Sequence, residues 1–557
     1  MRATRGAVIA LATAAVALLL FHPLREASPT GDDYLFLSLG RHLDDPLLLL
    51  VQDSTASYFF RPVVMLLWWA TSAATLDPAV HYAINIGLHV ANGLLLLALL
   101  RRMSISPAPA CIAALAFVAH PTAFSAAAWL SVRFDLVSLA FGLAALIAVD
   151  AASSRPPAPG VARFGAVVGL TLACVLSKET GFAIAAVALL AAAWPAPGRG
   201  ATPRSRAALA GTIAACIVAA LAIRWMVLRP AVEAMYLRQG TVATLWAGVA
   251  NWTASLPGFV LVRLGPATAT ASWAAALILL AILACTRGAR QAFRDRGLVR
   301  IAALGLALAA LAALAQAPVA SVSHLQAFTS GEFDFLSVTS ARLYYVPFAG
   351  LCIAAAALGE AIARAPLPRR SKRWAAAAIG IAAAVLLTQS RNVGREVTAF
   401  TQRIGPVYLR ATMDALNART WSTPGCKIYL LETPELAGFF RDFLQTAVLQ
   451  ALPRGHPVTR CFLLSEHAPW YNLLAADGLP ANAELPLETM EIGGKPFATL
   501  RLGNLTCYFL RIPDNDAVRD DPAATFFAYE DGRFVDVTAQ VRSRRRAVRF
   551  FDNRPKL

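Results

Sequence analysis

Long apolar runs constrain this chain more than any other feature. Runs of Ala, Leu, Val and Ile recur up to about residue 390 and then stop. Hydrophobic residues make up 57% of the chain and charged residues only 15%, whereas a soluble domain carries about 25% charged residues. The sequence therefore predicts an all-α polytopic membrane region, residues 1–390, followed by a water-soluble region, residues 391–557.

The apolar runs divide into about eleven predicted spans. They lie near residues 6–24, 80–100, 107–124, 135–151, 161–177, 180–195, 207–228, 271–286, 301–320, 343–363 and 374–390. Residues 58–76 form a further apolar segment that opens with Phe60, Arg61 and Pro62, and we interpret it as an interfacial or re-entrant helix. Residues 1–20 also resemble a signal peptide, and we interpret them as a retained first span.

The basic residues predict the orientation. The formal net charge is +17, which on a soluble protein would indicate nucleic-acid binding. Here the basic residues cluster in short loops between apolar runs, as the positive-inside rule expects of cytoplasmic loops. We therefore expect no nucleic-acid partner and place the first loop, residues 25–79, and the C-terminal region on the outer side. Arg391 and Arg395 do not follow this rule. The Ala- and Arg-rich usage is typical of a GC-rich bacterium, so the membrane would be its inner (plasma) membrane.

Two adjacent carboxylates, Asp32 and Asp33, follow the first apolar run. An amphipathic stretch begins at Tyr34, and a helix there would lie on the membrane and hold both carboxylates at the headgroup plane. An ionised carboxylate can accept a proton from a hydroxyl as a general base. The alternative is structural, namely a solvated loop or an acid that caps the helix.

Charged residues also stand at predicted span ends, where ionisable groups are costly and are functional candidates by default. His120 ends one span, and Arg133 and Asp135 begin the next; alternatively, these last two compensate each other as a structural pair. Lys178 and Glu179 lie in a short turn between two spans. A lysine there suits a phosphate headgroup.

Aromatic and polar residues add two further sets of candidates. Arg342, Tyr344 and Tyr345 open another predicted span, where they could bind a phosphate and stack on a sugar or form an aromatic belt at the interface. One helical face of the second span carries polar residues, for which we expect helix–helix hydrogen bonds rather than a metal site. These residues are His81, Asn85, His89 and Asn92. No metal-ligand spacing is present, so we predict no cofactor while leaving a divalent metal open.

The C-terminal region has a different pattern, which predicts a small α/β or α+β fold. We expect strands at residues 427–431 and 461–464, a helix at 434–452 and β-hairpins within 484–540. Cysteines 426, 461 and 507 could form one disulfide among them. No nucleophile elbow, phosphate loop or zinc spacing is present, so we interpret this region as a binding or packing module.

Six motifs in chain order resemble those of the GT-C superfamily of membrane glycosyltransferases. They are Asp-Asp-Tyr, Phe-Arg-Pro-Val, His-Tyr-Ala-Ile-Asn-Ile-Gly-Leu-His, Ala-His-Pro-Thr, Trp-Leu-Ser-Val-Arg-Phe-Asp-Leu and Ser-Lys-Glu-Thr-Gly. The chain resembles most the O-mannosyltransferases whose eukaryotic members carry tetratricopeptide tails, and it is also similar to bacterial lipid A aminoarabinose transferases. The resemblance covers roughly residues 1–350. The C-terminal region departs from it because it has no tetratricopeptide pattern.

The resemblance implies an inverting transfer of a sugar from a polyprenyl-phosphate donor to a hydroxyl acceptor of unknown identity. The catalytic acid would be Asp32 or Asp33, and the family pattern favours the first. Lys178, Arg133 and Arg342 would bind the donor phosphate. The supporting residues would be Glu179, Asp135, His120, Arg61, Tyr344 and Tyr345. The alternatives are a transporter or flippase of lipid-linked precursors, and a membrane-tethered binding protein.

Overall fold

The structure is a computed structural model of the 557-residue chain, and most of its described residues are helical. It describes all of the chain except residues 1, 52–59, 154–160, 195–201, 240–241, 261–294, 322, 324, 326–339, 366–368, 422–425, 433–443, 453–455, 467–470, 477–487, 490, 493–494, 497–499, 503–504, 512–514 and 549–557. The chain divides into two compact units. The first comprises residues 1–25, 82–223 and 239–397, and the second comprises residues 26–81, 224–238 and 398–557.

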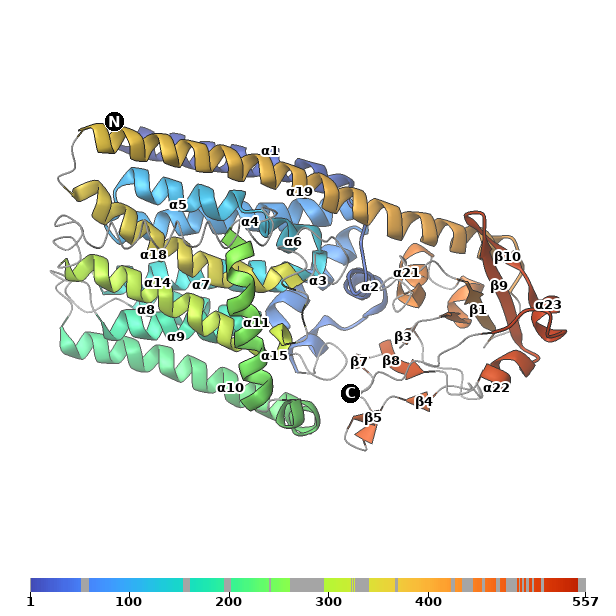
Figure 1. The fold of residues 1–557 in the computed structure, drawn as a ribbon. Coiled ribbons are helices and arrows are strands. Elements are labelled where there is room, and N and C mark those ends of the chain that lie inside the picture. The colour runs from blue at the N-terminus through green and yellow to red at the C-terminus, as the bar shows by residue number, and fades with distance from the viewer. Residues whose placement is uncertain are drawn as a thin grey trace. The chain divides into compact units, whose positions relative to one another are not determined.

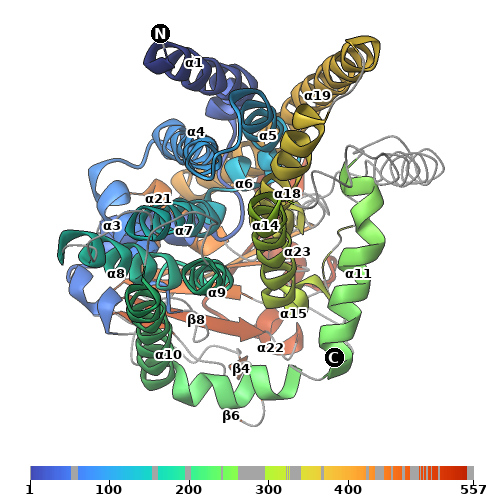
Figure 2. The same ribbon diagram turned by 90° about the vertical axis from the view of Figure 1, so that its left-hand side faces the viewer.

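The first unit is a helical bundle, which Figure 2 shows with several of its helices nearly end-on. Within it, α7 packs against α8 and α9, and α14 packs against α9 and α18. Its elements are α1 (Arg2–Phe21), α5 (Pro107–Ala119), α6 (Ala123–Ala128), η3 (Leu130–Val132), α7 (Arg133–Ala152), α8 (Val161–Val175), α9 (Thr180–Ala193), α11 (Val242–Val260), α14 (Arg296–Ala315), α15 (Ala317–Ala320), η4 (Ala341–Tyr344) and α18 (Tyr345–Arg364). Three long helices belong in part to each unit: α4 (Pro78–Arg102), α10 (Pro203–Gln239) and α19 (Arg369–Asn417).

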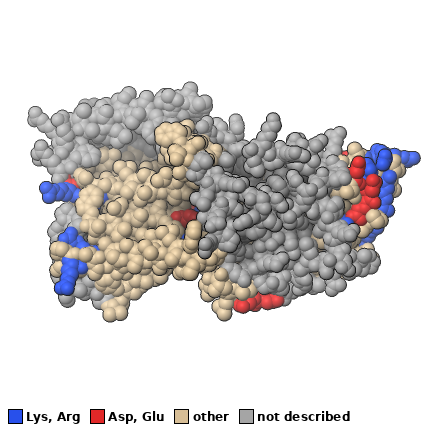
Figure 3. All heavy atoms as spheres, turned by 90° about the horizontal axis from the view of Figure 1, so that it is seen from below, with Lys and Arg blue, Asp and Glu red and all other residues tan. Residues whose placement is uncertain are grey.

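Five helices of the described part are long and apolar enough to cross a membrane. They are Pro78–Arg102, Leu130–Ala152, Pro203–Leu228, Arg296–Ala315 and Ala341–Arg364, and they overlap five of the predicted spans. Seen from below in Figure 3, the described surface of the bundle is largely uncharged and carries Lys and Arg at one end. A membrane protein with several spans is the architecture that these helices indicate.

The other predicted spans have different outcomes. Residues 161–177 and 180–195 form the shorter helices α8 and α9. Residues 107–124 do not form one helix, because α5 stops at Ala119 and His120 is extended, as expected of the residue before Pro121. The first predicted span lies in α1, and the last lies in the 49-residue helix α19, which continues well beyond residue 390. The predicted span at 271–286 lies outside the described residues.

Glycines allow α14 and α18 to approach closely. A Cβ atom on Gly350 would lie 2.5 Å from the backbone oxygen of Gly305 and 2.6 Å from the backbone nitrogen of Ala309. A Cβ atom on Gly305 would lie 2.6 Å from the backbone oxygen of Gly350. Small residues at such crossings let helix backbones pack directly on one another in apolar bundles.

The second unit combines the first loop with the C-terminal region. The first loop contributes α2 (Asp33–His42), η2 (Pro46–Leu50) and α3 (Pro62–Ala74). With 13 residues, α3 is only about 20 Å long at 1.5 Å per residue. It is therefore shorter than the hydrocarbon core of a bilayer, about 30 Å, as are α5, α8 and α9, and the interpretation of residues 58–76 as an interfacial or re-entrant helix stays a prediction.

The main sheet of the C-terminal region has the order β10-β9-β1-β2. β1 (Lys427–Leu431) pairs in parallel with β2 (Phe462–Ser465) and with β9 (Ala524–Glu530), and β10 (Arg533–Asp536) pairs antiparallel with β9. All five residues of β1 are buried, as expected of a strand with a parallel neighbour on each side. The predicted strand at 427–431 is confirmed, and the one predicted at 461–464 begins one residue later than expected.

The rest of the C-terminal region is a set of short helices and antiparallel strands. The predicted helix at 434–452 is present at its end as α21 (Leu444–Ala451), while its first ten residues lie outside the described ranges. Antiparallel pairing within 484–540 confirms the predicted hairpins. The remaining elements are η6 (Pro457–Arg460), β3 (Tyr471–Ala476), β4 (Glu488–Thr489), β5 (Glu491–Ile492), β6 (Lys495–Pro496), β7 (Leu500–Leu502), β8 (Leu505–Arg511), α22 (Asn515–Asp520) and α23 (Thr538–Arg542).

A disulfide joins the residues that precede two neighbouring strands of the main sheet. Cys426 and Cys461 are bonded, with their Cα atoms 4.5 Å apart. They immediately precede β1 and β2, whose register pairs Lys427 with Phe462. Of the three cysteines of the C-terminal region, these are the two that pair, and they lie in the same hydrophobic core.

Replacing Gly350 with alanine is expected to destabilise the bundle. The added methyl group would overlap backbone atoms of α14, and overpacking of this kind typically costs about 1–3 kcal/mol. Gly380 in α19 is the matched control, because a Cβ atom there would meet nothing within 4 Å. Thermal unfolding in detergent should show a lower midpoint for Gly350→Ala and an unchanged or higher one for Gly380→Ala. Equal midpoints would contradict the close α14–α18 contact.

Candidate functional site

The turn before α2 carries the two predicted catalytic carboxylates. Gly31 adopts a φ of 57°, a left-handed conformation that glycine accepts without steric cost. The N–H of Asp33 donates to the carbonyl oxygen of Thr30 at 3.1 Å, and the N–H of Thr30 donates to Oδ2 of Asp33 at 3.0 Å. Asp33 is fully buried. Its carboxylate therefore accepts a hydrogen bond from within the same turn and stabilises that turn.

Asp32 is the more accessible of the two acids. It is half-buried and stands at the N-cap position of α2, but its side chain makes no capping hydrogen bond. The capping role considered from the sequence is therefore not the role of Asp32. Burial raises the pKa of the neighbouring Tyr34 hydroxyl well above its usual range, and the charge of Asp33 adds to that rise. Tyr34 thus stays neutral, and Asp32 is the half-buried carboxylate of this turn whereas Asp33 is fully buried.

The helix that follows the carboxylates is covered by protein. The prediction that it lies on the membrane surface needs correction, because its apolar residues, Leu35, Phe36, Leu37 and Leu39 among them, are buried. Part of this cover comes from α3. The N–H of Gly40 donates to Oγ of Ser72 at 2.8 Å, and a Cβ atom on Gly40 would lie only 2.0 Å from the backbone nitrogen of Ala73. Arg61, a predicted supporting residue, is half-buried at the start of α3.

In the first unit, Lys178 and Asp135 form an ion pair. Nζ of Lys178 donates to Oδ2 of Asp135. The lysine side chain is 12% exposed and the aspartate side chain 1%. The other carboxylate oxygen, Oδ1, is buried and has no hydrogen-bond partner among the described residues. The structural alternative that paired Asp135 with Arg133 is replaced by this pair with Lys178, because α7 packs directly against α9.

Arg133 is held by the second predicted span. Its guanidinium is fully buried, and Nε donates to Oδ1 of Asn85 at 2.9 Å. Nδ2 of Asn85 donates in turn to the carbonyl oxygen of Leu130 at 3.2 Å. A buried guanidinium needs such acceptors, since burying a charge without partners is very costly. Asn85 therefore orients Arg133 at the start of α7.

The same face of α4 carries a second hydrogen-bond network. The hydroxyl of Tyr345 lies 2.9 Å from Nδ1 of His89 and accepts from Nδ2 of Asn92 at 3.1 Å. Nε2 of His89 lies 3.1 Å from the carbonyl oxygen of Val118. These contacts confirm the predicted hydrogen bonding of this face between helices. His81 differs, because a ring nitrogen lies 2.9 Å from the carbonyl oxygen of Thr75.

Arg342 contacts an aromatic ring. Its Cζ atom lies 4.3 Å from the ring centroid of Trp129, the geometry of a cation–π contact. Tyr344 is buried and hydrogen-bonds to the hydroxyl of Ser255. Tyr345 is buried as well. The aromatic-belt alternative is therefore wrong for both tyrosines, since a belt would leave them at the surface of the bundle.

The predicted phosphate-binding cations thus meet at one short segment, residues 129–135. Arg133 belongs to it, Lys178 pairs with Asp135 in it, and Arg342 stacks on Trp129 in it. We call these three cations the cationic cluster. All residues of this segment are buried, and this burial fixes its position in the bundle. Sequence spacing could not show that Lys178 and Arg342, from distant parts of the chain, contact the segment that contains Arg133.

Two other predicted supporting residues, His120 and Glu179, lie at helix ends. Nδ1 of His120 lies 2.7 Å from Oγ1 of Thr122, and its ring packs 4.4 Å from that of Phe348. Glu179 stands at the N-cap position of α9 without a side-chain capping bond. In the same hairpin, a Cβ atom on Gly181 would lie 2.3 Å from the carbonyl oxygen of Cys174. The tight turn therefore explains that glycine.

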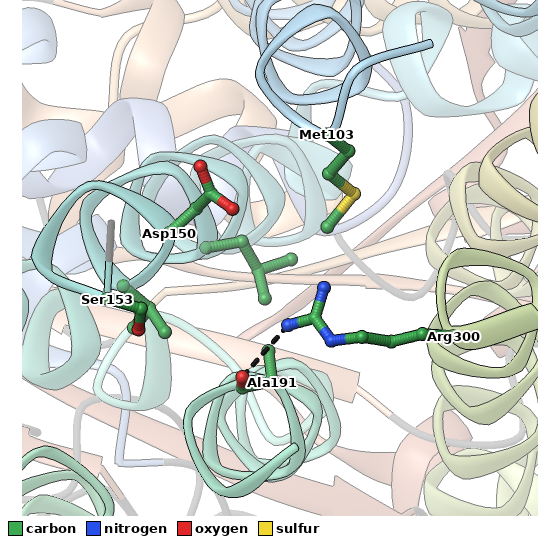
Figure 4. A pocket seen from close by; sticks show the side chains of 7 residues that line it. Met103, Asp150, Ser153, Ala191 and Arg300 are labelled. Atoms are coloured by element: carbon green, nitrogen blue, oxygen red, sulfur yellow. Dashed lines mark hydrogen bonds between the residues drawn. The ribbon is translucent and has the colours of Figure 1, made fainter. Parts of the chain in front are cut away.

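A small pocket in the first unit lies apart from these residues (Figure 4). Arg300 and Asp150 line it, and Nη2 of Arg300 donates to the carbonyl oxygen of Ala191 at 2.9 Å near the end of α9. Asp150 pairs with Arg102 at 3.3 Å. With about 10 Å³ open to the centre of a water molecule, the pocket has room for about one water. It is a structural feature and too small for a substrate.

The comparisons with known proteins add no further identification. No family model matches the chain, and a search of curated proteins finds no match. Within the described ranges, no group of three or more His, Cys, Asp and Glu side chains could hold a metal ion.

Breaking the Lys178–Asp135 pair from one side is expected to destabilise the protein strongly. Asp135→Asn leaves the lysine without its counter-ion, and uncompensated buried charges cost about 3 kcal/mol or more. The double variant Asp135→Asn, Lys178→Met should recover much of that loss, because it removes both charges. Denaturant unfolding in detergent measures both effects.

Asp295 supplies the matched control for this comparison. It pairs with Arg364 at 2.8 Å, with 41% and 47% of the two side chains exposed, and such exposed pairs contribute at most about 1 kcal/mol. Asparagine can also keep the capping bonds of Asp295 to α14. A loss in Asp135→Asn no larger than in Asp295→Asn would contradict the importance of the buried pair.

Proposed function

We propose that this protein is a membrane glycosyltransferase that moves a sugar from a polyprenyl-phosphate donor to a hydroxyl acceptor. The observation that carries the proposal is the cationic cluster on residues 129–135. Arg133 belongs to this buried segment and Lys178 and Arg342 contact it, and cations of these types suit an anion with several oxygens. A lipid phosphate is such an anion, and its hydrocarbon chain suits an apolar bundle.

The state of each cation supports this assignment. The pair with Asp135 keeps Lys178 charged at a position that is 12% exposed, so the lysine can still contact a ligand. Arg342 is half-buried on Trp129. A cation–π contact uses the face of the guanidinium, and the N–H groups of an arginine lie at its edge. Arg133, fully buried on Asn85, fixes the segment that the other two contact.

The proposed reaction is a single displacement. Asp32 accepts the proton of the acceptor hydroxyl as general base. The hydroxyl oxygen forms a bond to the anomeric carbon of the sugar, while the bond from that carbon to the phosphate oxygen breaks. Lys178 and Arg342 stabilise the negative charge that grows on the departing lipid phosphate, and the buried Arg133 holds the segment that they contact. One displacement inverts the configuration at the anomeric carbon.

The proposal includes a topology. We infer eleven spans in a bacterial inner membrane, with residues 25–79 and 391–557 on the outer side, as the basic loops indicate. Polyprenyl-phosphate sugars supply a donor on that face, and a hydroxyl of an envelope glycan, lipid or protein would accept the sugar.

The decisive experiment replaces Asp32 with asparagine. Membranes that contain the chain are incubated with radiolabelled sugars on polyprenyl phosphate, mannose and aminoarabinose among them, and label transferred to envelope material is counted. Asp32→Asn should lower the transfer rate about 100-fold or more, because general-base catalysis contributes about 10²–10⁴. Full activity in this variant would end the assignment of Asp32 as the base.

Asp45 is the matched control in the same loop. Its exposed carboxylate accepts from the N–H of Leu47 at 2.9 Å, and asparagine can make the same bond. Asp45→Asn should keep wild-type transfer. If the labelled lipid crosses vesicle membranes without transfer of its sugar, the chain is a transporter of lipid-linked precursors instead.

A further inference from the structure

The first-loop helix is bonded to the C-terminal region through Arg41. Nη1 of Arg41 in α2 donates to the carbonyl oxygens of Gln450 and Leu452, both at 2.7 Å. Gln450 lies in the last turn of α21 and Leu452 directly follows the helix, which packs against α2 (Figure 1). The last carbonyls of a helix lack partners within the helix and carry its negative partial charge. Arg41 therefore caps α21 with a cation from a segment about 400 residues away in sequence.

The other end of α2 is fixed in the same region. Tyr34, the residue after Asp33, is 3% exposed and belongs to one hydrophobic core with Tyr408, Ile428 and Leu444. That core includes the Cys426–Cys461 disulfide as well. Tyr34 and Arg41 thus anchor both ends of α2 to residues beyond 398.

The chain before the carboxylate turn is also bonded to this region. The N–H of Ser28 donates to Oγ1 of Thr401 at 3.4 Å, and Nε2 of Gln402 donates to the carbonyl oxygen of Glu26 at 2.9 Å. Residues 30–33 therefore lie between two segments that are each held by the C-terminal region.

We propose that the C-terminal region holds the general base in place and that Arg41 is a positioning residue. This inference rests on the proposed function, because it takes Asp32 as the base. A ten-residue helix is marginal in water by itself, so the orientation of the turn depends on what packs against α2, which is α3 at one side and the C-terminal region through Tyr34 and Arg41. Misplacement of a reacting group by about 1 Å can cost about 100-fold in rate. The C-terminal region thus takes part in the transfer reaction as the support of its base.

Arg41→Ala tests this in the full-length protein, with Arg41→Lys as a second variant that keeps the charge. Hydrogen exchange of residues 33–42 should be about tenfold faster in Arg41→Ala, because two charge-assisted hydrogen bonds are lost. Sugar transfer from radiolabelled polyprenyl-phosphate donors should show a lower kcat with an unchanged donor KM, since Arg41 does not bind the donor. Arg41→Lys should fall between wild type and alanine in both measurements.

Arg419→Ala is the matched control, because Arg419 belongs to the same region but pairs with the exposed Asp536 at 3.0 Å. It should leave both measurements at wild-type values. Unchanged exchange in Arg41→Ala would overturn the inference whatever the activity, and faster exchange with wild-type kcat would overturn the positioning role. Retained transfer in Asp32→Asn would instead overturn the proposed function, while the exchange result would still report the anchoring of α2.

Discussion

The ion pair between Lys178 and Asp135 is the interaction on which the candidate site depends. An ammonium group in an apolar bundle needs a counter-ion close by, since a buried charge without one is strongly destabilising. Asp135 supplies it from α7, and the carboxylate is in turn almost completely buried. The pair therefore fixes the hairpin before α9 against the start of α7. Arg133, the first residue of α7, is held by Asn85, and Arg342 contacts Trp129 shortly before α7.

The positions of these charges were visible in the sequence, but their partners were not. A charge that interrupts an apolar run stands out, so Arg133, Asp135, Lys178 and Arg342 were predicted as candidates from sequence alone. Which acid neutralises which cation depends on how α7 packs against α9, a contact between segments about 40 residues apart. Local spacing suggested Arg133 with Asp135, whereas the fold pairs Asp135 with Lys178. The choice of partner is therefore a tertiary property.

The fold shows the same division between local and long-range information. Apolar runs predicted where helices occur, because burial of apolar surface and backbone hydrogen bonding act within each run. The ends were predicted less well. Pro121 stops α5 earlier than hydrophobicity suggested, while α19 continues past residue 390 although its apolar run stops there. Hydropathy measures preference for lipid, whereas a helix ends where a residue breaks its hydrogen bonds.

An apolar face on a helix also does not specify what covers it. The alternation after Tyr34 fits a helix on a membrane surface as well as it fits a helix against protein. The structure covers α2 with α3 and with the core of the C-terminal region. The first loop and the C-terminal region thus belong to one compact unit, which contains the carboxylate turn. Such a unit cannot be divided at the end of the last apolar run without separating Asp32 from the residues that hold it. The first loop and the C-terminal region therefore make one functional element in the proposed reaction.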